Sequence, residues 1–95
     1  MPGIARLGDV DSGHACWPPR PSDMASGNVY VNNIGAHRQG DHWVVHCCGP
    51  LCHDGTLASG SSTVYVNNKQ VGRIGDPVAC GSTVAAGSGS VFAGG

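Results

Sequence analysis

The chain is 95 residues long, 40% hydrophobic and 12% charged, with a formal net charge of −1. A chain of this length forms one domain with a modest core, and its charge excludes the basic surface that nucleic-acid binding needs. Eleven Val and sixteen Gly contrast with a single Lys and no Glu. This composition excludes a helical bundle and predicts an all-β domain of short strands joined by glycine-rich turns.

Two short sequence elements occur three times each, always in the same order. The first is Arg-x-Gly-Asp, at residues 6–9, 38–41 and 73–76. The second is a Val-aromatic-Val/Ala triplet behind a Ser/Gly cluster, at residues 29–31, 64–66 and 91–93. The chain therefore consists of three similar units, each with two strands and a variable loop between them. We expect the Arg and Asp of each frame to pair with one another.

The triplets have the alternation of β-strands. At residues 29–31 the two Val face one way and the Tyr faces the other, and residues 64–66 repeat this pattern. Asn-Asn follows both of these triplets and supplies turn residues that tolerate positive φ. Either the aromatic residues or the Val residues form the core, and the other set forms a contact surface. The equivalent aromatic positions are Tyr30, Tyr65 and Phe92.

Five Cys and five His are many for a chain of this length. An odd number of Cys argues against a closed disulfide framework, and residues 1–6 lack the apolar segment of a signal peptide. A mixture of Cys and His in a domain with a small core favours a metal site. His14, His46 and Cys80 follow the Asp of the three frames by five, five and four residues. These ligands meet if the three units surround a common axis.

Zinc requires a fourth ligand, and the longest loop, between residues 41 and 64, supplies the candidates. They are His53, Cys47, Cys48 and Cys52. Cys47 and Cys48 are neighbours whose side chains diverge on a strand, so one ion does not easily bind both. Cys16 follows His14 by two residues and is either a ligand or a small core residue.

Two further His have simpler interpretations. His42 directly follows a Gly-Asp turn and is expected to be an exposed turn residue. His37 lies on the strand before Arg38, where alternation gives it a lateral partner or solvent. We expect that replacing His37 changes neither metal content nor stability.

The repeated Arg-x-Gly-Asp frames and the Val-Tyr-Val-Asn-Asn strands resemble the PAAR-repeat proteins, over residues 5–95. Proteins of this family cap the spikes of type VI secretion systems and contractile phage tails. The resemblance implies a small cone of three β-hairpin repeats with pseudo-threefold symmetry, and an apex that holds zinc through three His and one Cys. Carried onto this chain, the ligands are His14, His46 and Cys80, with His53 as the fourth. The additional Cys around His53 depart from the family pattern.

The resemblance also implies a structural role without catalysis. One copy caps a trimeric β-helical spike and transiently pierces the outer membrane of a target cell. From their equivalent positions in the three units, we expect Tyr30, Tyr65 and Phe92 to be the docking residues if the aromatic set and not the Val set forms the contact. We expect a single domain over residues 1–95 with no effector extension, either in a phage baseplate or secreted through a type VI system. Of these two, the sequence of residues 36–43 favours the phage tail. No small-molecule substrate is expected.

Two other functions would use the same metal. A small zinc hydrolase needs an open coordination position and a nearby general base, yet the chain has no Glu and four ligands close the site. A zinc-knuckle nucleic-acid binder needs more than five Lys plus Arg. Iron is the alternative metal, since His and Cys both bind it.

Overall fold

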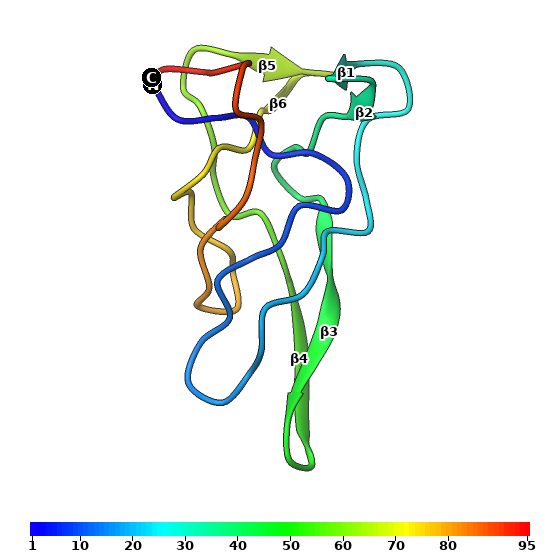
Figure 1. Cartoon of the computed structure of the whole chain (residues 1–95), viewed down its shortest axis with the longest axis vertical. Helices are drawn as coiled ribbons and strands as arrows, with labels where there is room; N and C mark the ends of the chain where they lie inside the picture. Colours follow the sequence, from blue (N-terminus) through cyan, green and yellow to red (C-terminus); the bar gives the residue numbers. More distant parts are fainter.

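Short strands form at the first two triplets and in the long second loop of the computed structural model, which describes residues 1–95 (Figure 1). The predicted all-β fold is confirmed, and the structure has no helix that could span a membrane. Six strands make three two-stranded antiparallel sheets. They are β1 (Tyr30–Val31) with β2 (Ile34–Gly35), β3 (His42–Cys48) with β4 (Leu51–Thr56), and β5 (Tyr65–Val66) with β6 (Lys69–Gln70).

The three repeats share one pairing rule. The aromatic residue of each triplet pairs with the residue three positions before the Arg of the following frame. The pairs are Tyr30 with Gly35, Tyr65 with Gln70, and Phe92 with Gly3. The third pair joins the two ends of the chain. The first two repeats are therefore closed by hairpins, whereas the third is closed by pairing between the N-terminal and C-terminal segments. Both termini therefore lie together at the broad end of the molecule (Figure 1).

The turns of the two repeat hairpins depend on residues that accept a left-handed backbone. Asn32 and Asn33 have φ of 54° and 65°, and Asn67 and Asn68 have φ of 53° and 64°. Asn tolerates this region because its short polar side chain bonds locally. The predicted role of the Asn-Asn pairs is confirmed.

A closed ring of backbone hydrogen bonds lies inside the molecule. The N–H of His37 donates to the carbonyl of Ala5 (2.9 Å), that of Ala5 to Gly72 (2.8 Å), and that of Gly72 to His37 (2.9 Å). Each of these residues directly precedes the Arg of one frame, so the repeat itself produces the ring. This arrangement gives the fold its pseudo-threefold symmetry.

The core has two layers. The layer at the broad end contains two residues from each repeat. They are Ile4, Ala36 and Val71, each two positions before the Arg of a frame, and Val31, Val66 and Ala93, the last residues of the triplets. The second layer breaks the symmetry, because it contains the large side chains of Trp43 and Leu57 from the second unit. It supports the long β3–β4 hairpin, which runs from there to the narrow end (Figure 1).

Each Arg-x-Gly-Asp frame is closed by the predicted ion pair. Arg38 Nε lies 2.8 Å from Asp41, and the equivalent pairs Arg6–Asp9 and Arg73–Asp76 each have a closest approach of 2.9 Å. In each frame Oδ2 of the Asp accepts both the Nε–H and the backbone N–H of the Arg, so the turn is held in one conformation. The three variable loops therefore leave the ring from fixed and equivalent positions.

Candidate metal centre

A β-bulge in β3 lets Trp43 and His46, which are three residues apart, both point into the molecule. Trp43 pairs with Gly55 and His46 pairs with His53, so three residue steps on β3 face two on β4. The additional residue cancels the strict alternation of the strand, and both Trp43 and His46 are buried. Because directly opposed residues of an antiparallel pair share a face, His53 points to the same side as His46.

The first loop brings His14 to this hairpin on a tight turn. Its ends are joined by two backbone bonds, from His14 N–H to the Trp17 carbonyl (3.0 Å) and from Trp17 N–H to the His14 carbonyl (2.8 Å). The indole N–H of Trp17 donates to the carbonyl of Leu51 on β4 (3.0 Å). The indole ring also stacks on His14 and His53, with centroids 5.0 and 4.7 Å away. Trp17 thus fixes the turn against β4.

Cys80 comes from the third loop, which closes against β4 at a glycine. A Cβ on Gly55 would lie 3.0 Å from the Cβ of Cys80 and 3.1 Å from its backbone nitrogen. This is tighter than nine in ten real Cβ contacts, so a side chain at this position would require the third loop to shift by a few tenths of an ångström. Gly55 therefore permits the approach of Cys80 to the two His of the hairpin.

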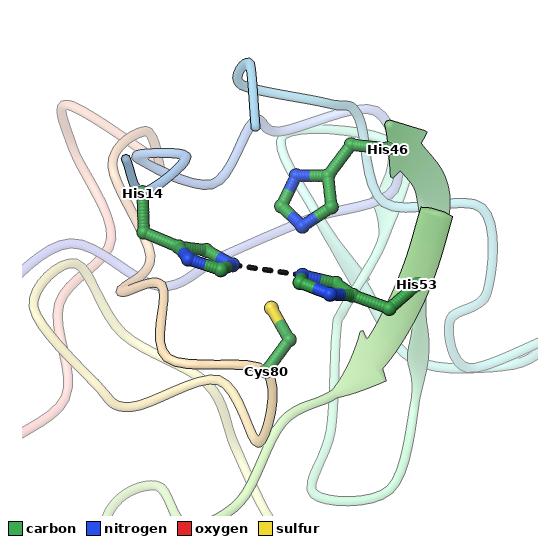
Figure 2. A group of neighbouring side chains, drawn as sticks. All are labelled: His14, His46, His53 and Cys80. Atoms are coloured by element: carbon green, nitrogen blue, oxygen red, sulfur yellow. Dashed lines mark hydrogen bonds between the residues drawn. The ribbon is translucent and has the colours of Figure 1, made fainter. Parts of the chain in front are cut away.

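Four potential ligands converge in this region, one from each outer loop and two from the hairpin. His14, His46, His53 and Cys80 have their ligand atoms within 4.8 Å of one another (Figure 2). The nearest pair is His14 Nε2 and His53 Nε2, which are 2.8 Å apart. A tetrahedral zinc site with bonds of about 2.0–2.3 Å separates its ligand atoms by about 3.3–3.8 Å, so small side-chain rotations fit the cluster to the ion.

The hydrogen bonding of His46 fits a metal ligand. Its Nδ1 lies 2.9 Å from the carbonyl of Pro18, which only accepts, so Nδ1 carries the proton. The other nitrogen, Nε2, is buried without a hydrogen-bond partner and faces the centre of the cluster (Figure 2). A buried lone pair without a partner is costly, and a metal ion would compensate it.

The protonation state of His53 is suited to the same chemistry. Partial burial and the neighbouring imidazoles of His46 and His14 lower the pKa of His53 below its usual 6.5. The ring is therefore neutral at pH 7, as a metal-binding imidazole must be. The residues present thus form a cluster that can hold a metal ion.

The two remaining His lie outside the cluster. His42 is not a plain turn residue, because it begins β3 and its nitrogens lie 2.8 Å from Asp23 and 2.7 Å from Asp54. Hydrogen bonds to these carboxylates raise the pKa of His42. His37 is neither lateral nor exposed: it is fully buried, and its ring centroid is 4.0 Å from that of Trp43. The predicted environment of His37 is therefore wrong, and its burial leads us to expect a loss of stability when it is replaced.

The expectation against a disulfide framework is also wrong. Cys47 pairs with Cys52 across the hairpin, and Cys48 pairs with Cys16 of the first loop. Cys16 is thus neither a ligand nor a core residue. The predicted divergence of Cys47 and Cys48 is confirmed, because each bonds to a different partner. Cys80 is the one free cysteine.

Sequence reasoning missed two residues of the site, Trp17 and Pro18. Trp17 covers two of the imidazoles, and the Pro18 carbonyl orients the third. The only signal in the sequence is their position directly after His14-Ala15-Cys16. Nothing in that spacing predicts stacking on His53, which lies 36 residues further along the chain.

The aromatic residues of the three triplets lie at the opposite end from the hairpin tip. Tyr30, Tyr65 and Phe92 are 59%, 55% and 47% exposed. Their neighbours Val31, Val66 and Ala93 are buried in the layer at the broad end. Of the two arrangements that the sequence leaves open, the structure has the one with the aromatic side chains outside.

Comparison with known proteins places this architecture in a family. Residues 12–86 match the family model of the PAAR motif. The chain is 41% identical over 74 residues, 72% of its length, to the NAD(P)(+) glycohydrolase toxin Tse6 of Pseudomonas aeruginosa PAO1. The same identity and coverage hold for the (p)ppApp synthetase toxin Tas1 of strain UCBPP-PA14. The chain belongs to the PAAR-motif family, which supports the role of a spike tip, and it spans 17% of the length of each relative.

Proposed function

We propose that this chain is the metal-stapled tip of a membrane-piercing spike. The observation that carries the proposal is the separation of two features on one elongated molecule, 37 Å long and about 22–23 Å wide. Four potential metal ligands converge on the hairpin that extends to the narrow end. Three equivalent aromatic residues are exposed on the strands at the broad end.

The broad end suits one copy of this chain on a trimer. A trimeric spike presents three identical surfaces, and the chain offers three similar units around one pseudo-threefold axis. Exposed aromatic residues are enriched where protein partners bind most strongly. Tyr30, Tyr65 and Phe92 are the docking residues in this proposal, and the partner is a trimeric β-helical spike.

Zinc is the metal that suits the four side chains. Three imidazoles and one thiolate form a closed tetrahedral set of the structural type, and zinc has no redox chemistry that would damage neighbouring thiols. Iron accepts the same ligands and is the alternative. When bound, the metal joins three loops where hydrophobic packing is thinnest, so it supplies stiffness.

The hydrogen bonding of the one nearby acid favours a structural role over a zinc hydrolase. Asp54 adjoins His53, but its carboxylate is bonded to His42 at 2.7 Å. With four protein ligands no coordination position is left for water. The enzymatic activities named in the two relatives belong to much longer proteins, and we do not assign them to this chain.

Of the two machines, we favour a type VI secretion system over a phage tail. Both relatives are toxins of a bacterium. Of the two machines, a secretion system is the one that delivers toxins to another cell. The chain would then leave the cell on the spike, cross the outer membrane of the target transiently, and need no signal peptide.

Elemental analysis of protein purified without added metal tests the site. We expect about one equivalent of zinc, or of iron, and its loss in Cys80→Ser and His14→Ala together with a lower melting temperature. His42→Ala is the matched control, because His42 lies outside the cluster and should leave the metal content unchanged. Less than about half an equivalent in a folded wild-type chain would refute the metal site.

Titration against the trimeric β-helical spike protein of the source organism tests the docking. We expect one copy per trimer by mass photometry or analytical ultracentrifugation. Three copies per trimer, or no binding, would refute the proposed tip.

A further inference from the structure

We propose that the Cys16–Cys48 disulfide is a redox-controlled link that positions the metal ligands and slows the release of the metal. The inference rests on the proposed metal site. It assigns a separate role to cysteines that do not contact the ion, and it predicts that the tip is more firmly closed in an oxidising compartment than in a reducing one.

The disulfide and the metal cluster join the same two segments. His14 and Cys16 lie two residues apart on the tight turn of the first loop, and His46 and Cys48 lie two residues apart on β3. The Cα atoms of Cys16 and Cys48 are 5.3 Å apart, although 32 residues separate them in the chain. Because the disulfide fixes the turn relative to β3, it fixes His14 relative to His46 without occupying a ligand position.

The second disulfide lacks this property. Cys47 and Cys52 are only five residues apart and lie opposite each other in the β3–β4 register. Their bond joins two strands that backbone hydrogen bonds already pair, and it makes no connection to the first loop. This disulfide is therefore a matched internal control for the Cys16–Cys48 link.

Cys80 remains available to the metal when the other four cysteines are oxidised. It is unpaired, and its Sγ lies in the cluster with the three His. The odd cysteine count thus separates two roles, with four thiols for two cross-links and one thiolate for the ion. Oxidation of the four does not consume a ligand.

The redox step needs an external disulfide as oxidant. Two thiols of the chain form one S–S bond, and the two electrons and two protons reduce the oxidant's disulfide to two thiols. In a reducing cytosol the four cysteines are thiols and the metal alone joins the first loop to β3. After delivery into an oxidising compartment, the disulfide acts in parallel with the metal.

The test compares oxidised and reduced forms of the metal-loaded wild-type chain, so it needs no variant to fold. Oxidised glutathione or a phosphine reductant sets the redox state, and alkylation with peptide mass mapping assigns the bonds. Metal release into a chromogenic chelator should be at least about tenfold slower in the oxidised form. The double variant Cys16→Ser/Cys48→Ser should lose this difference, whereas Cys47→Ser/Cys52→Ser should keep it.

Equal release rates in the two forms would overturn the proposal, as would a disulfide that contains Cys80. Loss of the difference in the Cys47/Cys52 variant would also overturn it, because the link would then not be specific. If the chain binds no metal, the metal site fails, but the link is still tested by thermal unfolding of the metal-free chain. The oxidised form should then melt higher than the reduced form, and only the Cys16/Cys48 variant should remove that shift.

Discussion

Trp43 and His46 lie three residues apart on β3, yet both side chains are buried. On a regular strand, residues three apart face opposite sides of the sheet. The bulge between them rotates the outer half of β3, so that Trp43 fills the core while His46 faces the metal cluster. One additional residue therefore links the core of this molecule to its candidate metal centre.

Deletion of Val45 should leave His46 in the cluster. Val45 lies in the bulge and is exposed, and its removal sets Trp43 and His46 two residues apart, where a regular strand gives both side chains the same face. We therefore expect the folded chain to keep its metal content and its circular dichroism spectrum. Loss of metal from a folded deletion variant would contradict this explanation of the bulge.

Replacement of His37 by Ala should destabilise the chain by about 3 kcal/mol without changing its metal content. The substitution leaves a cavity beside Trp43 and removes the hydrogen bond from His37 Nδ1 to the Met24 carbonyl (2.9 Å). Urea denaturation measures the first effect and elemental analysis the second. A stable variant, or one without metal, would show that His37 has another role.

His37 should also contribute to the pH dependence of stability. Burial lowers the pKa of His37 below its usual 6.5, so the unfolded chain binds a proton there more readily than the folded chain. The free energy of unfolding therefore falls as the pH drops below about 6.5. The loss between pH 7 and pH 5 should be smaller in His37→Ala than in the wild-type chain.

The three Arg–Asp pairs should differ in energy although their geometry is the same. The side chain of Asp41 is 2% exposed, whereas that of Asp9 is 14% exposed. Breaking a buried pair leaves an uncompensated charge, so Asp41→Asn should cost about 3 kcal/mol and Asp9→Asn clearly less. Urea denaturation of the two variants makes this comparison within one chain, and the reverse order would contradict it.

Each exposed aromatic residue at the broad end should contribute to docking on the spike. Truncation of Tyr30, Tyr65 or Phe92 to Ala should weaken the binding by about 2 kcal/mol, or about 30-fold in Kd. Leu51→Ala is the control, because Leu51 is 64% exposed near the tip of the hairpin. Calorimetric titration that finds equal effects for all four variants would argue against a docking surface at the base.

Gly55→Ala should displace the third loop and lower the metal content. The new Cβ would lie 3.0 Å from the Cβ of Cys80, so one of the two segments must move. Gly27→Ala is the matched control, since a Cβ there has nothing within 4 Å. Elemental analysis of the two variants should show a loss of metal in the first only; full occupancy in Gly55→Ala would contradict the role assigned to this glycine.

The repeat in the sequence determined the fold class and the symmetry. Arg-x-Gly-Asp closes a turn through a local ion pair, and Asn-Asn turns a hairpin through its own backbone preference, so both features depend on near neighbours in the chain. Their threefold recurrence predicts three equivalent loops. Similar offsets from the Asp residues, of five, five and four positions, then select His14, His46 and Cys80, which the structure brings together with His53.

Tertiary structure alone decided what breaks that symmetry. Three features join residues that lie far apart in the sequence: the pairing of Phe92 with Gly3, the Cys16–Cys48 disulfide and the stacking of Trp17 on His53. The burial of His37 depends on its contact with Trp43. A periodic pattern describes which way a side chain faces on a regular strand. Such a pattern does not describe where an additional residue changes the strand register, because long-range packing selects that position. In this chain the packing of Trp43 and the approach of the three loops selected the position of the bulge in β3.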